Sequence, residues 1–187
     1  MNKNSIGIYG GSFNPFHKGH EYVIQNTKKY LDLSHFYIVP NYNNPLKSKI
    51  PQKPICEILN NLRNSTINLK VKVSPLEYSI KSQSTYELLR KIQKKCTLES
   101  FILIIGLDQL WELDRWVNFD WIINNISICI VSRPSYDIEI DKTKIYNKYS
   151  PYFMTSAKQF LLSTSPNLFL LKLEGIDISS TYIRNNS

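Results

Sequence analysis

The sequence is short of cysteine and of long apolar runs, and each shortage excludes a class of protein. Its three cysteines, Cys56, Cys96 and Cys129, are odd in number and lie far apart. This spacing argues against a zinc site or a disulfide framework and favours a reducing setting. The longest nearly apolar run, residues 101–105, falls far short of the ~18 residues that cross a bilayer. The first residues lead straight into a strand pattern instead of a secretion signal. We therefore expect a cytoplasmic protein without a membrane partner.

Acidic residues are also in the minority, and the formal net charge is +8. A nucleic-acid surface or a pocket for small anions could both account for this excess. However, 18 of the 23 basic residues are lysines that are scattered along the chain, and no aromatic-basic RNA motif is present. We therefore expect no nucleic-acid partner, and a basic RNA-binding domain on a degenerate nucleotide fold remains the alternative from another class.

Apolar patterns of strand and helix type alternate along the chain, which predicts an α/β fold with an open, Rossmann-like parallel sheet and helices on both faces. With 187 residues and no internal repeat or domain linker in the sequence, we expect one domain spanning residues 1–187. Residues 137–151 are the least regular and are expected to form a long loop or a peripheral insertion. The predicted strands are 5–9, 36–39, 69–73, 101–105, 126–131 and 168–173, and the predicted helical segments are 19–31, 55–62, 85–95 and 110–123.

Four of the six glycines and two of the three histidines stand in one stretch, "GIYGGSFNPFHKGH", after the first predicted strand. We expect Gly10 and Gly11 to let the backbone turn sharply and approach a ligand. The stretch matches neither a Walker A loop nor the G-x-G-x-x-G pattern. His17 and His20 stand three residues apart at a predicted helix start, where their side chains and the free N–H groups can bind an anion. The alternative is that the histidines only cap or fill the turn.

A second motif, "ISSTYIR", occupies residues 178–184. Ser179 or Ser180 can cap a helix whose first N–H groups bind phosphate, and Arg184 can clamp phosphate oxygens one turn later. An ordinary capped helix is the alternative for this motif taken alone. Since the sequence ends three residues after Arg184, the helix is short, and we expect phosphate binding to order it.

The stretch "GGSFNPFHKGH" resembles the signature of the H-x-G-H nucleotidyltransferase superfamily, and "ISSTYIR" resembles its partner motif. Three further stretches resemble the nicotinate-nucleotide adenylyltransferase family: "PNYNNPLK", "STYELL" and "GLDQLWELDRW". In the first of these, Lys47 fits the family pattern, whereas Leu46 replaces a histidine of the family. "SRP", which contains Arg133, matches another short stretch. The resemblance runs from residue 6 to residue 184 and implies one nucleotidyltransferase domain.

This resemblance implies a role for each matching residue. The catalytic residues would be His17, His20 and Arg184, which steady charge as pyrophosphate leaves. ATP would be bound by Gly10, Gly11, Ser12, Phe13, His17, His20, Gly106, Asp108, Arg133, Ile178, Ser179, Ser180 and Arg184. The mononucleotide would be bound by Lys47, Thr85, Asp108 and Trp116.

The chemistry of two of these residues agrees with those roles. Trp116 can stack on a flat pyridinium ring, and Asp108, directly after a predicted buried strand, can accept hydrogen bonds from ribose hydroxyls. The alternatives are core packing for Trp116 and a helix cap for Asp108, and we expect Trp111 and Trp121 to lie in the core.

The implied reaction is adenylyl transfer from ATP to nicotinate mononucleotide, which gives deamido-NAD and pyrophosphate. Mg²⁺ would arrive with the ATP phosphates, so we expect no metal-binding cage of protein side chains. Nicotinamide mononucleotide and phosphopantetheine are the alternative acceptors. The tryptophan segment and the Asn/Pro loop argue against phosphopantetheine.

Overall fold

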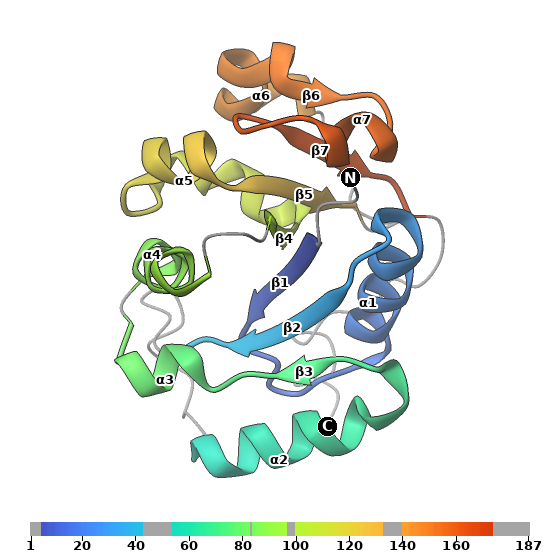
Figure 1. Ribbon diagram of the computed structural model, residues 1–187, viewed down its shortest axis with the longest axis vertical. Coiled ribbons are helices and arrows are strands. Elements are labelled where there is room, and N and C mark those ends of the chain that lie inside the picture. The colour runs from blue at the N-terminus through green and yellow to red at the C-terminus, as the bar shows by residue number, and fades with distance from the viewer. Residues whose placement is uncertain (1–4, 43–53, 83, 97–99, 133–139, 174–187) are drawn as a thin grey trace.

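The computed structural model describes residues 5–42, 54–82, 84–96, 100–132 and 140–173. Its strands form one sheet in which every pair is parallel, in the order β3-β2-β1-β4-β5-β7-β6. Figure 1 shows β1 and β2 crossing the middle of the molecule, with helices on either side. The predicted Rossmann-like α/β fold is therefore confirmed. The strands are β1 (Ser5–Gly11), β2 (His35–Pro40), β3 (Lys72–Val73), β4 (Ser100–Gly106), β5 (Ser127–Val131), β6 (Phe153–Met154) and β7 (Leu168–Leu171).

Alternating side chains along the strands build two separate cores, one on each face of the sheet. Ile6, Ile8 and Leu103 face the core beneath α4, α5 and α6, whereas Tyr9 and Ile104 face the core beneath α1, α2 and α7. Both faces of β4 are buried, as its continuous apolar run predicts. The helices are α1 (Lys18–Leu31), α2 (Ile55–Ser65), α3 (Leu76–Ile80), α4 (Thr85–Lys95), α5 (Phe119–Asn125), α6 (Lys144–Tyr149) and α7 (Ala157–Leu162).

The tryptophan-rich segment differs from the single helical region that its pattern predicts. It forms two 3₁₀ turns, η3 (Leu107–Trp111) and η4 (Leu113–Arg115), before α5 begins. Asn118 interrupts the helical path because its backbone is left-handed, with φ of 50°, a conformation that asparagine tolerates better than most residues. The segment therefore turns directly after Trp116, a predicted site residue.

The prediction of an irregular loop or insertion at residues 137–151 is wrong for its second half. Thr143 caps α6 through its side-chain oxygen, which accepts a hydrogen bond from the Tyr146 N–H. Ile145 and Tyr149 of α6 are buried against the core. Because α6 has only six residues, its apolar face is too short to give a periodic signal in the sequence.

The order of the strands indicates the edge of the sheet at which a ligand would bind. The chain leaves β1 toward β2 on one side and returns as β4 on the other side of β1. In open α/β sheets, ligands bind beyond the carboxyl ends of the strands at such a reversal. None of the helices in the described parts of the chain is long and apolar enough to cross a membrane.

Candidate active site

The carboxyl ends of β1 and β4 bring the two best-defined motifs to the same edge of the sheet. The end of β1 leads through residues 12–17 into α1, which begins with the two histidines. The end of β4 leads directly into η3, which contains Asp108. Topology alone therefore unites residues that are about 90 positions apart in the sequence.

His17 and His20 form a reciprocal cap at the start of α1. The Gly19 N–H donates to Nδ1 of His17 over 3.1 Å, and the His17 N–H donates to Nδ1 of His20 over 3.3 Å. Since each Nδ1 accepts a hydrogen bond, each neutral imidazole carries its proton on Nε2. The capping role that we considered as an alternative is thus present, but it uses only one nitrogen of each ring. The Nε2–H groups are the donors that could act on a phosphate.

Aromatic side chains hold the His20 ring in a fixed orientation. Phe16 stacks on it with ring centroids 5.4 Å apart, and Phe13 meets it edge-on at 5.0 Å. The centroid of the His17 ring lies 3.8 Å from that of His20, and these two side chains are only 8% and 7% exposed. Because the rings are locked by packing, their donors are preorganised, as stabilisation of a charged transition state requires.

Gly10 and Gly11 do not form the sharp turn that we expect from the sequence. Both belong to β1, and the left-handed residue of this segment is Phe13, with φ of 45°. That conformation costs about 1–2 kcal/mol in a residue other than glycine. Gly11 instead permits a close approach, since a Cβ there would lie 3.0 Å from the Phe13 ring. The glycine therefore makes room for the ring that packs on His20.

Gly106 has a similar function beside Asp108. A Cβ on Gly106 would collide with the Asp108 carboxylate, which folds back toward the end of β4 and accepts a hydrogen bond from Gln109 Nε2 over 2.7 Å. Asp108 lies within the first turn of η3, not at its cap. Its half-buried carboxylate thus stands directly beyond the carboxyl end of β4.

The start of α4 lies where the sequence predicts it. Ser84 is the N-cap, and its hydroxyl accepts a hydrogen bond from the Glu87 N–H over 3.3 Å. Thr85 is the first helical residue. A helix start of this kind presents further N–H groups and a partial positive charge, which suit a carboxylate.

The three tryptophans differ in their surroundings. Trp116 is half-buried and packs against the core beneath α4 and α5. Trp111 is 49% exposed, so our prediction that it lies in the core is wrong. Trp121 packs against the same core as Trp116 and meets Tyr86 edge-on, with the Arg90 guanidinium 5.0 Å from its ring.

Sequence reasoning missed Glu77, a buried acid in α3. Its carboxylate is the acceptor for the Tyr42 N–H at 2.8 Å, directly after β2. Burial raises the pKa of Glu77 to about 7, against which the hydrogen bond from Tyr42 acts only weakly. Glu77 therefore holds the backbone at Tyr42, two residues after the end of β2. The sequence does not predict this pairing, because Tyr42 and Glu77 are 35 positions apart.

Six predicted site residues lie outside the described parts of the chain, so their roles and the expected ordering by phosphate stay predictions. They are Lys47, Arg133, Ile178, Ser179, Ser180 and Arg184. Among the residues that are described, no group of three or more His, Cys, Asp or Glu side chains is arranged to hold a metal ion.

Comparison with known proteins gives consistent results. A model of the cytidylyltransferase-like family matches residues 8–186. A probable nicotinate-nucleotide adenylyltransferase of Methylorubrum extorquens is 29% identical over 181 residues, which cover 96% of this chain and 98% of the relative. A second protein of that name, from a Caulobacter species, is 31% identical over 129 residues, or 69% and 68% of the two chains.

The fold also matches a solved structure, the nicotinic acid mononucleotide adenylyltransferase of Plasmodium falciparum complexed with NaAD. The TM-score is 0.72 at 20% sequence identity, and the match covers 97% of this chain and 83% of the other.

Proposed function

Since this chain belongs to the cytidylyltransferase-like family, we propose that it transfers the adenylyl group of ATP to nicotinate mononucleotide, giving deamido-NAD and pyrophosphate. The observation that carries the reaction class is the locked pair of His17 and His20 at the reversal of strand order. The choice of acceptor rests on the relatives named nicotinate-nucleotide adenylyltransferase. The enzyme thus acts in NAD biosynthesis.

The reaction is an in-line displacement at the α-phosphorus of ATP. A phosphate oxygen of the mononucleotide forms the new P–O bond, and the bond to the β-phosphate bridging oxygen breaks, so pyrophosphate leaves with the electron pair. The attacking oxygen is already anionic, so no general base is required. Catalysis consists of positioning and charge stabilisation. The Nε2–H groups of His17 and His20 donate to phosphate oxygens, and Arg184 clamps the triphosphate.

Reaction with ATP is consistent with a divalent metal, and we assign this role to Mg²⁺. A Mg²⁺ ion that arrives with ATP would be held mainly by phosphate oxygens and water. When bound, Mg²⁺ neutralises phosphate charge.

The remaining residues would recognise the two nucleotides. The carboxylate of Asp108 accepts hydrogen bonds from ribose hydroxyls, and the start of α4 at Thr85 binds the pyridine carboxylate. Trp116 stacks on the pyridine ring, and Lys47 contacts the mononucleotide. The other ATP contacts come from residues 10–13, Gly106, Arg133 and residues 178–180. We further propose that residues 1–187 are one domain, that it works in the cytoplasm, and that its partners are small molecules and not nucleic acid or membrane.

The decisive experiment measures pyrophosphate release from Mg-ATP with three acceptors. We expect fast release with nicotinate mononucleotide and much slower release with nicotinamide mononucleotide, because a cluster of backbone N–H groups favours a carboxylate over a neutral amide. Phosphopantetheine should give none. Equal rates with the two pyridine nucleotides would contradict the specificity, and activity with phosphopantetheine alone would contradict the assignment. Tight, strongly salt-dependent RNA binding without pyrophosphate release would favour the RNA-binding alternative.

Trp116→Ala should raise the KM for the mononucleotide about 5- to 150-fold and leave the KM for ATP nearly unchanged. Stacking of an aromatic side chain on a flat ring is worth about 1–3 kcal/mol in nucleic-acid complexes. Trp111→Ala is a matched control, since Trp111 lies in the neighbouring turn and is half exposed. Steady-state kinetics measures both effects. A change in thermal stability alone, without a change in KM, would assign Trp116 to the core.

A further inference from the structure

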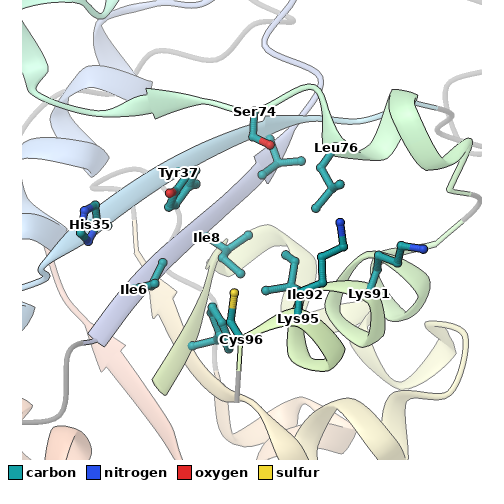
Figure 2. A pocket seen from close by; sticks show the side chains of 12 residues that line it. Ile6, Ile8, His35, Tyr37, Ser74, Leu76, Lys91, Ile92, Lys95 and Cys96 are labelled. Atoms are coloured by element: carbon teal, nitrogen blue, oxygen red, sulfur yellow. The ribbon is translucent and has the colours of Figure 1, made fainter. Parts of the chain in front are cut away.

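A cavity of about 380 Å³ lies between the sheet and the helices α3 and α4, apart from the candidate active site. Ile6 and Ile8 of β1 form its floor, and Ile92 of α4 and Cys96, the residue directly after α4, form one wall. Tyr37 of β2 stands opposite them (Figure 2). The volume falls within the ~300–1,000 Å³ typical of small-molecule sites, which are likewise mostly apolar with a few polar groups.

The cavity exists because the helices on this face leave β2 partly uncovered. The core beneath α4, α5 and α6 packs on β1, β4 and β5, and α3, with only five residues, shields little of β2. As a result Tyr37 is only half-buried, and His35 at the start of β2 is exposed. The cavity thus has an apolar interior and an open side.

Two lysines give the cavity its charge. Lys91 and Lys95 line it from successive turns of α4, and both are exposed. Among the residues that the structure describes, no Asp or Glu side chain belongs to the lining. Figure 2 shows the amine of Lys95 directed toward Leu76, across the space above Ile92. A ligand with an apolar body and one negative charge would satisfy both parts of this lining.

We propose that this cavity binds a free monocarboxylate with an unbranched, medium-length alkyl chain. The chain lies on Ile6 and Ile8, and the carboxylate meets Lys91 and Lys95 at the mouth. The site is separate from the mononucleotide site, because α4 begins at Thr85 on the carboxyl edge of the sheet and Lys95 is ten residues further on, about 15 Å along the helix. The inference does not depend on the proposed reaction.

Cys96 provides a direct readout of occupancy. It lines the cavity and is half-buried, whereas Cys56 is exposed and Cys129 is fully buried. Burial strongly raises the pKa of the Cys129 thiol, which keeps it unreactive. In a Cys56→Ser variant, alkylation therefore reports on Cys96. We expect decanoate to slow this alkylation in a saturable manner, and decylamine and 1-decanol at equal concentration to have much smaller effects.

Two charge-reversal variants, made in the Cys56→Ser background, test the role of the lysines. Lys95→Glu should weaken decanoate binding roughly three- to tenfold, the size expected when an exposed ion pair is replaced by a repulsive one. Lys94→Glu is the matched control: it makes the same charge change on the same helix at an exposed residue that is not part of the lining, so affinity should not change. Ile92→Trp should abolish binding by filling the cavity, and thermal unfolding verifies that each variant is folded.

Three results would overturn the proposal. They are no protection of Cys96 up to the solubility limit of decanoate, equal protection by the amine or the alcohol, and equal loss of affinity in the Lys94 and Lys95 variants. Saturable protection of Cys96 by nicotinate mononucleotide itself would also overturn it, because the cavity would then belong to the nucleotide site. Because alkylation is measured without ATP, failure here leaves the adenylyl-transfer assignment untouched.

Discussion

His20→Ala lowers kcat by about 10²- to 10³-fold and changes the KM for ATP much less, because it removes a preorganised donor to charge that develops in the transition state. The Nδ1 of His20 is occupied by the His17 N–H, so the catalytic donor is Nε2–H. Stopped-flow or steady-state measurement of pyrophosphate release gives the rate.

Two amide substitutions separate catalysis from capping at this position. In His20→Asn the amide oxygen can replace Nδ1 as acceptor for the cap, but no donor reaches the position of Nε2. In His20→Gln the amide N–H₂ can reach the position of Nε2. A catalytic role predicts that the Gln variant is faster than the Asn variant, and a purely structural role predicts the opposite order. His35→Ala serves as the control, since His35 is an exposed residue at the opposite end of β2.

We expect Glu77→Gln to stabilise the protein more at high pH than at low pH. The gain in free energy of unfolding over the unsubstituted protein should be about 3 kcal/mol larger at pH 8 than at pH 4.5. Burial raises the pKa of Glu77 from 4.5 to about 7 in the folded protein, and each unit corresponds to about 1.36 kcal/mol. Because the folded pKa is the higher one, the acid's contribution to stability is fully present below pH 4.5 and is lost as the pH rises through 7. Glutamine carries no charge and escapes this loss.

Urea unfolding of both proteins from pH 4.5 to 8 measures the effect as a growing difference in stability. Glu87→Gln is the matched control, because Glu87 is an exposed carboxylate nearby on α4. A difference that stays constant with pH would show that Glu77 titrates no higher in the folded protein than in the unfolded chain. Burial, with smaller contributions from Glu77 and Tyr42, raises the pKa of the neighbouring Tyr78, so this side chain does not titrate between pH 4.5 and 8.

Elements with a strong local signal could be predicted from the sequence, and elements defined by distant contacts could not. The predicted bounds of α4 agree with the structure, because Ser84 caps it and Leu88 and Leu89 mark its buried face. The prediction of one helical region over residues 110–123 was wrong, because the pattern of apolar residues does not reveal the left-handed backbone at Asn118. The helix α6 was missed because only Ile145 and Tyr149 face the core.

The same division holds at the candidate site. The two histidines and Asp108 could be selected because residue type, spacing and position after a strand all point to chemistry. The use of Nδ1 for capping and the packing of Phe13 over Gly11 depend on backbone geometry that the motif does not specify. The hydrogen bond from the Tyr42 N–H to Glu77 depends on the position of α3 relative to β2, which only the folded chain defines.

The place of β1 in the sheet has a consequence for synthesis of the protein on the ribosome. β1 is made first, yet one of its two neighbours, β4, ends only at Gly106. Until β4 has been synthesised, β1, which will lie between β2 and β4, therefore has an open edge. Such edges pair readily with other chains, and contacts between distant segments form slowly. The edge of β1 is therefore closed on both sides only after β4 has left the ribosome.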